Sequence, residues 1–340
     1  MHLDVAYYTN DSFNQILSPR GPQSTGYIFC STNAGNVYNK GIELSISATP
    51  VETRNFSWDL AINAAGNRGT LDGLPDGTNV MYVTDVQYAG AQAASFNGGN
   101  FMAIAGTRWT RDGKGNVVLN DNFFPTYTND LVEVGNREAK VSGGINNTLR
   151  FKNFTFNMLW EFRVGGDVIN GTLYAMDVAG VSKRSADWRN QTLTVTGVQQ
   201  IGKDADNNPI YGDVVSKTWK ADEVYEFNGQ QKLGYNIIKD YYTSYYQKET
   251  ANYITSVNSL RLRTISLNYN IPSTLLKKIG FIKRASVNVA ANNLLLFTNY
   301  YGDPETAASG AGVGGSSSVG FDYCGVPATA GFTAGINLTF

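Results

Sequence analysis

The feature that most constrains the fold of this chain is a strict alternation of apolar and polar residues. Phe56, Trp58 and Ile62 alternate with polar side chains, and residues 154–163 repeat the pattern. Successive side chains of a β-strand point to opposite faces, so a period of two predicts strands with one apolar and one polar face. Strands are predicted on this basis in the segments 2–16, 42–48, 56–64, 139–151, 154–163, 258–271, 284–297 and 329–340.

The connections between these segments alternate in length. The short ones are 50–55, 152–153 and 272–283, and the long ones are 18–36, 68–138, 165–257 and 298–328. Transmembrane β-barrels combine short periplasmic turns with long extracellular loops, and their strands of ~10 residues turn an apolar face to lipid. The sequence therefore predicts an all-β fold: an antiparallel transmembrane β-barrel portion of about eight strands in contact with a lipid bilayer.

Composition excludes several classes of protein and of site. No segment approaches the ~18 uninterrupted apolar residues of a membrane-spanning helix, so any crossing of a membrane must use strands. The formal net charge of -1, without a block dense in Lys or Arg, argues against nucleic-acid binding. His2 is the single histidine, which argues against Ser-His-Asp catalysis and histidine-rich metal sites. Cys30 and Cys324 lack CxxC spacing, and a disulfide between them stays open.

No pair of carboxylates stands out as a general acid and base, so we expect no catalytic residue, no metal, no cofactor and no enzyme activity. Asp204, Asp206 and Asn208 place oxygen-bearing side chains at alternate positions, as at the start of a calcium loop. Pro209 stands where that loop requires glycine, and Val215 stands where it requires a bidentate glutamate. A solvated turn is the better interpretation. Residues 112–116 are likewise expected to form a hairpin turn, because glycine adopts positive φ readily.

Two short helices are expected inside the connections. The first covers Val168 to Gly180, and the second covers Ser273 to Ile279, with Ser273 as its N-cap after Pro272. The remaining parts of the long connections show no periodic pattern, so we expect them to be loops that carry binding residues.

Aromatic residues occur on the predicted strands and in the long connections. Trp58, Trp160 and Tyr269 lie on apolar strand faces, where lipid contact or an interfacial aromatic girdle is expected. Aromatics in the outward connections usually pack within the loops, and the alternative is that they stack on sugar rings or dock a partner. The residues expected to contact a ligand are Trp109, Trp188, Tyr211 and Trp219.

Several segments resemble the C-terminal barrel half of the SusC/RagA group of TonB-dependent transporters. The segment NVYNKGIELSISATPVETRNFSWDLAINAAGNR, residues 36–68, resembles two paired strands of that family, and GTRWTRDGKGNVV, residues 106–118, resembles a hairpin. Residues 134–172 end in the family pattern G-G-x-x-x-N-G-T, although Asn136-Arg137-Glu138 replaces an Asn-Pro-Asp-like sequence. The most similar stretch is 259–305, from SLRLRTISLNYN to NNLLLFTNYYGDPE.

This resemblance implies a plugged barrel of about 22 strands, of which the chain supplies the last third. The first residues show neither a basic region nor an apolar run. We therefore expect the signal peptide, the plug domain and the TonB box to lie upstream. The family imports nutrients, glycans or peptides, through the outer membrane of Gram-negative, Bacteroidetes-like cells. It works with a SusD-like surface lipoprotein and the TonB complex.

The C-terminal segment resembles an outer-membrane assembly signal, which is an amphipathic last strand with an aromatic terminus. The residues expected to be read by the outer-membrane assembly machinery are Phe332, Ile336, Leu338 and Phe340. Physically, an exposed strand edge with alternating apolar residues is a template for strand addition.

Two other classes of function stay open at this stage. A self-contained eight-stranded barrel, acting as an adhesin or structural protein, would need a signal peptide and a first and a last strand that pair with each other. A secreted carbohydrate-binding β-sandwich, or an all-β lyase, would bury Trp58 and Trp160 between two sheets.

Overall fold

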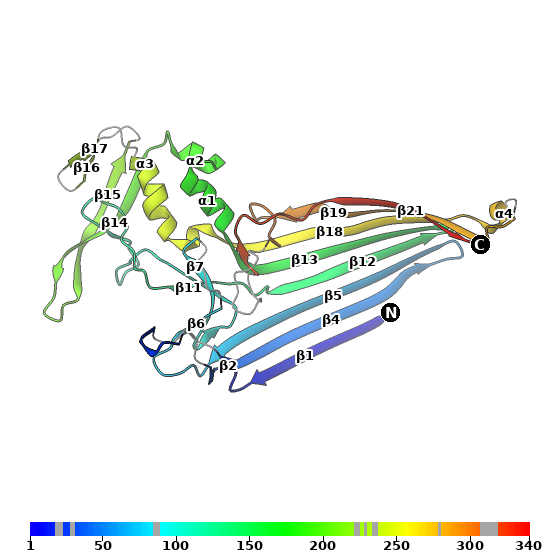
Figure 1. The fold of residues 1–340 in the computed structure, drawn as a ribbon, viewed down its shortest axis with the longest axis horizontal. Helices are drawn as coiled ribbons and strands as arrows, with labels where there is room; N and C mark the ends of the chain where they lie inside the picture. The colour runs from blue at the N-terminus through cyan, green and yellow to red at the C-terminus, as the bar shows by residue number, and fades with distance from the viewer. Residues whose placement is uncertain are drawn as a thin grey trace.

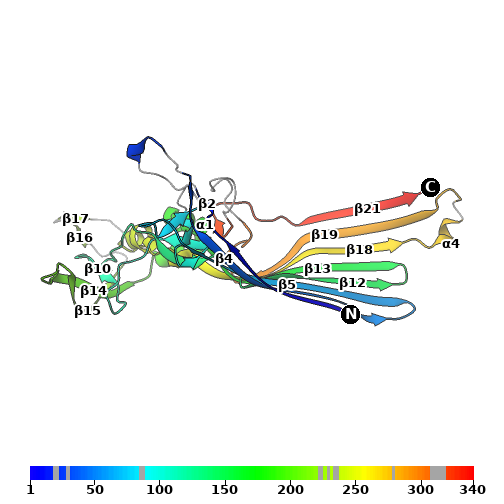
Figure 2. The ribbon, with the colours of Figure 1, turned by 90° about the horizontal axis from the view of Figure 1, so that it is seen from below.

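Among the residues that the structure describes, eight long antiparallel strands form a single-layer sheet, which we call the wall (Figure 1, Figure 2). The computed structural model describes residues 1–17, 23–27, 31–83, 89–220, 225–227, 230–232, 237–277, 280–306 and 319–340. The wall strands lie side by side in chain order: β1 (His2–Ser12), β4 (Asn36–Glu52), β5 (Phe56–Asp72), β12 (Val141–Phe151), β13 (Phe154–Asn170), β18 (Ile254–Asn270), β19 (Arg284–Thr298) and β21 (Gly331–Thr339). The predicted strands are thus confirmed.

The strand register aligns the apolar side chains on one face of the wall. Phe56 lies opposite Phe151, which lies opposite Phe154, which in turn lies opposite Tyr269. A period of two keeps this alignment along each pair of strands. The wall therefore has a continuous apolar face and a polar face on its other side.

The connections are short at one end of the wall and long at the other, as predicted. Both chain termini lie at the end with the short turns (Figure 1). The connection between β18 and β19 contains the helix α4 (Ser273–Leu276). The prediction that Ser273 caps this helix is wrong, because the helix begins one residue earlier than expected. Pro272 occupies the N-cap position, and no side chain bonds there.

The long connections fold together into a second region, which we call the head (left in Figure 1). It contains two further sheets, with strand orders β11-β9-β7-β6 and β10-β14-β15. Their strands are β6 (Val80–Tyr82), β7 (Ala91–Phe96), β9 (Ala103–Gly106), β10 (Val118–Leu119), β11 (Val132–Asn136), β14 (Leu193–Lys203) and β15 (Pro209–Trp219). Short pairs join β2 (Ile16–Leu17) to β3 (Thr32–Asn33) and β16 (Tyr225–Phe227) to β17 (Gln230–Lys232).

The expectation of irregular loops was wrong for these sheets. Half of the residues of β7 and β9 are alanine, and every residue of β9 is buried. A strand that is buried on both faces shows no alternation in its sequence. Two more short strands, β8 (Gly99–Asn100) and β20 (Phe321–Asp322), attach parts of the head to β5 and β13.

The helices of the head follow β13 and precede β18. They are α1 (Gly171–Ala179), α2 (Lys183–Trp188) and α3 (Ile237–Asp240). A π-helical turn, Tyr241–Tyr245, and two 3-10 turns, Tyr246–Lys248 and Thr250–Tyr253, follow α3. Another 3-10 turn, Gln23–Thr25, lies between β2 and β3. The predicted helix 168–180 is confirmed with a later start. Its N-cap is Asn170, whose Oδ1 accepts a hydrogen bond from the Leu173 N–H at 2.7 Å. Gly180 ends it in the left-handed conformation.

The G-G-x-x-x-N-G-T pattern marks the passage of β13 from the wall into the head. Gly165 and Gly166 have φ values of 72° and 81°, which side chains other than glycine rarely adopt. Four residues later Asn170 caps α1, and the Thr172 hydroxyl donates to Oδ1 of Asp322 at 2.7 Å. The pattern therefore turns the strand, begins the helix and ties both to β20.

The buried core of the protein lies in the head. One cluster includes Ala91, Ile104, Ile169, Tyr253 and Phe321, and a second contains Leu119, Phe124, Leu193, Val195, Trp219, Ile237, Ile238 and Tyr241. The wall, in contrast, is one layer thick (Figure 2), and its Ile42 and Phe297 are 55% and 57% exposed.

This architecture rules out both alternative folds. Within the described residues no second sheet covers Trp58 or Trp160, so the β-sandwich interpretation is wrong. The edge strands β1 and β21 do not pair with each other in the described part of the chain, so the strands do not close into a small barrel of their own.

Candidate functional site

The apolar face of the wall is suited to contact with a non-aqueous phase. At the end with the short turns, Phe154 and Tyr269 pack with ring centroids 4.5 Å apart, and Phe281 stacks on Phe340 at 6.1 Å. Nearer the head, Trp160 stacks on Phe297 at 6.5 Å. Two aromatic bands that flank aliphatic residues are the arrangement found where barrel strands cross the two interfaces of a bilayer. The described residues include no helix long and apolar enough to span a membrane.

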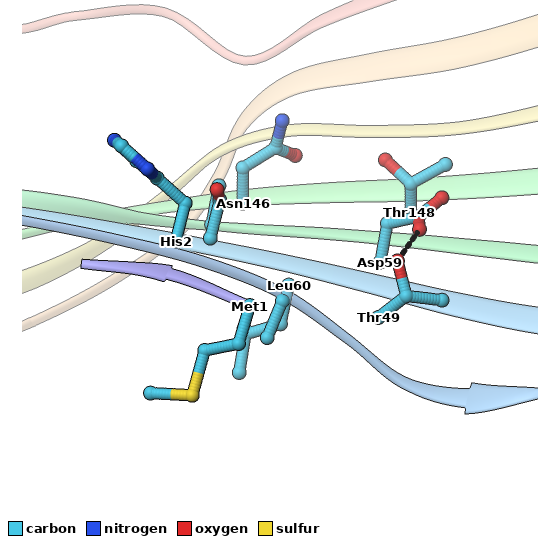
Figure 3. Close-up of a pocket in the computed structure, with 10 residues that line it drawn as sticks. Met1, His2, Thr49, Asp59, Leu60, Asn146 and Thr148 are labelled. Atoms are coloured by element: carbon cyan, nitrogen blue, oxygen red, sulfur yellow. Dashed lines mark hydrogen bonds between the residues drawn. The ribbon is translucent and has the colours of Figure 1, made fainter.

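The polar face carries hydrogen-bonding groups over hollows in the sheet. Figure 3 shows one of these, a cavity of about 350 Å³ beside Asp59, whose Oδ1 accepts from the Thr49 hydroxyl at 2.7 Å. Arg150 forms an ion pair with the same carboxylate. A larger hollow of about 700 Å³ lies along the same face between Glu43 and Glu161. Such a surface suits water and polar solutes.

Where the wall meets the head, the polar face carries a chain of ion pairs. Arg263 donates from Nε to Oε2 of Glu161 at 2.5 Å and from Nη2 to Oε2 of Glu305 at 2.6 Å. Arg261 donates from Nε to Oε1 of Glu305 at 3.2 Å and also pairs with Asp303. These contacts fix the start of the connection between β19 and β21 against the polar face.

A β-bulge makes this cluster possible. The pairing of β13 with β18 skips Arg263, because Leu159 lies opposite Thr264 and Trp160 lies opposite Leu262. An extra residue in one strand changes which face the following residues occupy. Arg261 and Arg263 therefore both contact Glu305 on the polar face. We did not predict this cluster, although the apolar positions of the segment shift from even to odd numbers between Leu262 and Ile265.

Three of the four aromatic residues expected to contact a ligand lie in one cluster in the head. Trp109 donates from Nε1 to the Tyr245 carbonyl at 2.8 Å. Trp219 is 7% exposed and stacks on Phe124 at 6.0 Å. These two rings therefore pack inside the head, and a role in ligand contact stays a prediction.

Trp188 and Tyr211 lie in different surroundings. Trp188 stacks face to face on Tyr242, with centroids 3.7 Å apart, and lines a cavity of about 310 Å³ beside α1 and α3. Tyr211 lies apart from the cluster, opposite Gln200 in the β14–β15 hairpin. Ligand contact by either residue is likewise still a prediction.

Burial alters the acid–base behaviour of the head. It raises the pKa of Tyr241 and of Tyr253 above the ordinary tyrosine value, and for Tyr253 the nearby Asp177 carboxylate adds to the effect. Burial also lowers the pKa of Arg137 to about 10. The Arg137 guanidinium donates to the carbonyls of Ala103 and Val319, at 3.3 and 3.0 Å.

Both predicted turns are confirmed. Asp112 Oδ1 accepts from the N–H groups of Lys114 and Asn116, at 2.9 and 2.7 Å, and Gly115 has φ 88°. Asp204 Oδ1 accepts from two main-chain N–H groups in the same way, including that of Asn208 at 2.8 Å. The carboxylate of each aspartate therefore accepts hydrogen bonds from the main chain of its own turn. The part of the chain with described structure contains no group of three His, Cys, Asp or Glu residues that could hold a metal ion.

The residues expected to form the assembly signal lie on the edge strand β21 and just after it. Phe332, Ile336 and Leu338 are exposed, and Phe340 packs only against Phe281 among the aromatic contacts of the described residues. Their recognition by an assembly machinery stays a prediction. Cys324 is exposed, and Cys30 lies outside the described residues.

Comparison of the sequence with known proteins finds TonB-dependent receptors. No family model matches the chain. The chain is 25% identical to TonB-dependent receptor P3 of Formosa agariphila, over 100% of this chain and 32% of that protein. TonB-dependent receptor SusC of Bacteroides thetaiotaomicron is 31% identical over 77 residues, which cover 23% of this chain and 8% of SusC.

The fold is similar to that in the structure of the RagAB peptide transporter, with a TM-score of 0.64 and 19% identity over 99% of this chain and 33% of that chain. A second structure, the RagAB peptide importer in the closed-closed state, gives a TM-score of 0.62 and 17% identity, over 99% of this chain and 33% of the other. The chain spans about a third of the length of the curated relatives that it matches from end to end.

Proposed function

We propose that this chain forms part of the wall and the outward loops of an outer-membrane nutrient importer, because its whole length is similar in sequence to TonB-dependent receptors and similar in fold to the RagAB transporter. The single observation that carries the proposal is the one-layer wall, with a continuous apolar face on one side and a polar, charged face on the other. The strands of a transmembrane barrel have these two faces, because one side contacts lipid and the other contacts a polar lumen.

The two ends of the wall differ in structure, and we assign each end to one side of the membrane. The short turns face the periplasm, and the head faces outward, where its aromatic residues and cavities meet the solute. The polar face lines the lumen of a larger barrel, which is closed by a plug domain supplied by another part of the receptor. Eight strands are too few for a plugged lumen of this kind, which takes about 22.

Import is driven through the TonB complex, which contacts segments outside this chain. The solute is a glycan or a peptide, and a SusD-like surface lipoprotein captures it at the head. This proposal is supported by the names of the relatives, TonB-dependent receptors and SusC, and by the similarity to the RagAB peptide transporter. The chain performs no chemical reaction of its own in this role. Recognition of Phe332, Ile336, Leu338 and Phe340 by the assembly machinery delivers the barrel to the membrane.

The test uses the whole receptor in its native host. We expect the receptor in the outer-membrane fraction, extracted only by detergent, and co-purified with a lipoprotein. Deleting the receptor gene or the tonB gene should abolish uptake of the same labelled peptides or oligosaccharides. Recovery of the receptor in a detergent-free soluble fraction, or uptake that persists without TonB, would contradict the proposal.

A further inference from the structure

Positive charge is concentrated in the connection between β18 and β19, in residues 277–284, which we call the basic turn. Its cations are Lys277, Lys278, Lys283 and Arg284. The basic turn follows α4 at the end of the wall opposite the head (Figure 1). The sequence contains no Asp or Glu between positions 249 and 303, so neither the two adjoining strands nor the turn itself supplies an acidic side chain.

The surroundings of the basic turn neutralise only part of this charge. Among the described residues, Lys277, Lys283 and Arg284 are exposed and form no ion pair. The main-chain carboxylate of Phe340 lies beside the turn and offsets one charge. Glu52 is at the same end of the wall, but its strand β4 is four strands from β18, or about 19 Å at ~4.8 Å per strand. The basic turn therefore keeps a surplus of positive charge.

An apolar groove of about 510 Å³ lies on the apolar face of the wall, across β13, β18, β19 and β21. Its shape follows from the strand register. Ala291 lies opposite Ile265 on one side and Phe332 on the other, and in the next row Ala334 lies opposite Val289. Small side chains between large ones on one face of a sheet leave a hollow. We call this hollow the apolar groove.

The basic turn and the apolar groove lie in line along β19. Lys283 immediately precedes this strand, and its N–H donates to the Thr339 carbonyl at 2.7 Å. The period of two places Lys283 on the same face as Val287 and Val289. Tyr269 of the aromatic band lies opposite Val287, between the turn and the groove.

The distance between the two features corresponds to one leaflet of a bilayer. Val289 is six residues beyond Lys283, or about 20 Å along the strand at ~3.3 Å per residue. A barrel strand tilted by ~40° descends about 15 Å over this length, which is half of the ~30 Å hydrocarbon core. The turn is thus at the depth of lipid headgroups, and the groove is at the depth of the acyl chains of the same leaflet.

An anionic phospholipid has the two parts that these features require. Each lysine ammonium has three N–H donors for phosphate oxygens, and basic clusters at a membrane surface bind anionic headgroups. An acyl chain in the groove gains dispersion contacts along its length. A free phosphate ion has no apolar part, and a phosphatidylcholine headgroup already carries its own compensating cation.

From these observations we propose that the basic turn and the apolar groove form one site for an anionic phospholipid of the periplasmic leaflet. Lys277 and Lys283 bind the headgroup phosphate, and the groove holds one acyl chain. The inference rests on the proposed place of the wall in the membrane. It adds a ligand that the receptor binds and does not import.

The test measures which lipids the full-length receptor retains after purification in detergent. The receptor is incubated with mixed micelles that contain equal amounts of dioleoyl phosphatidylglycerol and dioleoyl phosphatidylcholine, purified again, and analysed by mass spectrometry of the extracted lipid. We expect the wild type to be enriched in phosphatidylglycerol. The double variant Lys277→Gln, Lys283→Gln should lower this enrichment by about ten-fold, because it removes two cations from the headgroup.

A matched double variant controls for the general charge of this end of the wall. Arg54→Gln with Lys152→Gln removes two exposed cations from the neighbouring short turns and should leave the enrichment unchanged. Ala334→Phe fills the apolar groove at an exposed position without altering charge, and it should lower the amount of retained phosphatidylglycerol.

Several results would overturn the site. They are equal retention of the two lipids by the wild type, an equal loss in the two double variants, and unchanged retention by Ala334→Phe. Displacement of the lipid by soluble peptidoglycan fragments would replace it with an anionic polymer as the ligand. Each of these results leaves TonB-dependent uptake to be demonstrated separately, whereas a receptor that stays soluble without detergent would overturn the import function and the lipid site together.

Discussion

The indole Nε1 of Trp58 donates a hydrogen bond to Oδ1 of Asn147, 3.2 Å away, on the apolar face of the wall. Asn147 lies opposite Leu60 on β5 and Met158 on β13, so its amide is a polar group among apolar neighbours. In a lipid environment an amide without a partner is unfavourable. The hydrogen bond gives the indole N–H of Trp58 and the amide oxygen of Asn147 a partner within the sheet.

Trp58→Phe should therefore destabilise the receptor by about 1–3 kcal/mol, because it leaves the Asn147 amide without its donor. Adding Asn147→Leu to that variant should recover most of the loss. Urea unfolding of the receptor in lipid vesicles measures both. Trp160→Phe is the control, since no hydrogen bond of its indole is seen among the described residues. Equal losses in the two tryptophan variants would show that ring size, and not the hydrogen bond, matters.

Gly166→Ala should impair folding at the passage of β13 into the head. The residue has φ 81°, and a Cβ would lie 2.9 Å from both the Ala139 nitrogen and the Arg137 carbonyl oxygen. We expect the substitution to lower the free energy of unfolding by on the order of 1–3 kcal/mol. The experiment detects this as a lower yield of folded receptor in the outer membrane. Gly113→Ala, at a position with open space, should have little effect. Normal yield of the Gly166 variant would mean that the strand can turn there without glycine.

Buried and exposed ion pairs of the wall should respond differently to loss of the arginine. Arg261 and Asp303 have 4% and 6% of their side chains exposed, whereas Arg150 and Asp59 have 54% and 37%. Arg261→Met should destabilise by about 3–5 kcal/mol, since it leaves a buried carboxylate uncompensated. Arg150→Met should change stability by only about 0–1 kcal/mol. The urea concentration at the midpoint of unfolding is measured for both variants and for the wild type. Similar midpoints for the two variants would contradict the predicted difference between the buried and the exposed ion pair.

The head should lose stability at alkaline pH. Burial raises the folded-state pKa of Tyr241 and Tyr253, so their stabilising effect is complete below the unfolded value of about 10 and decreases as the pH rises above it. Tyr253→Phe should flatten this decrease, as followed by near-UV circular dichroism and tyrosinate absorbance. Arg137, whose pKa is lowered to about 10, acts in the opposite sense, so the variant and the wild type are compared at each pH. Identical profiles would exclude Tyr253 as a contributor.

The wall could be predicted from the sequence because each of its strands has two unlike faces. Every second residue from Phe154 to Phe162 is apolar, with only Leu159 out of phase, and the structure confirms the strand and its neighbours. The head could not be predicted in the same way. Ala103–Gly106 is a strand buried on both faces, and its small residues show neither a helical nor a strand period. Local patterns define a strand only when its surroundings differ on its two sides.

The candidate sites show a similar division. The sequence indicates which aromatic residues lie in the outward connections, but not that Trp219 would be buried against Phe124. The ion pairs of Arg261 join residues more than forty positions apart, and nothing local links them. The shift of apolar positions after Leu262 was visible in the sequence and would have indicated the bulge. Long-range partners, in contrast, follow only from strand order and register.

The bulge at Arg263 also indicates where chains of this kind can vary in length. A residue inserted within a regular wall strand would move every later side chain of that strand to the opposite face, so that apolar side chains face water and polar ones face lipid. A bulge at the insertion prevents this shift. The same insertion in a connection of the head moves no side chain of the wall. Additions and deletions among related receptors should therefore collect in the outward connections, so that new solutes can be accommodated while the membrane-crossing segments keep a constant number of residues.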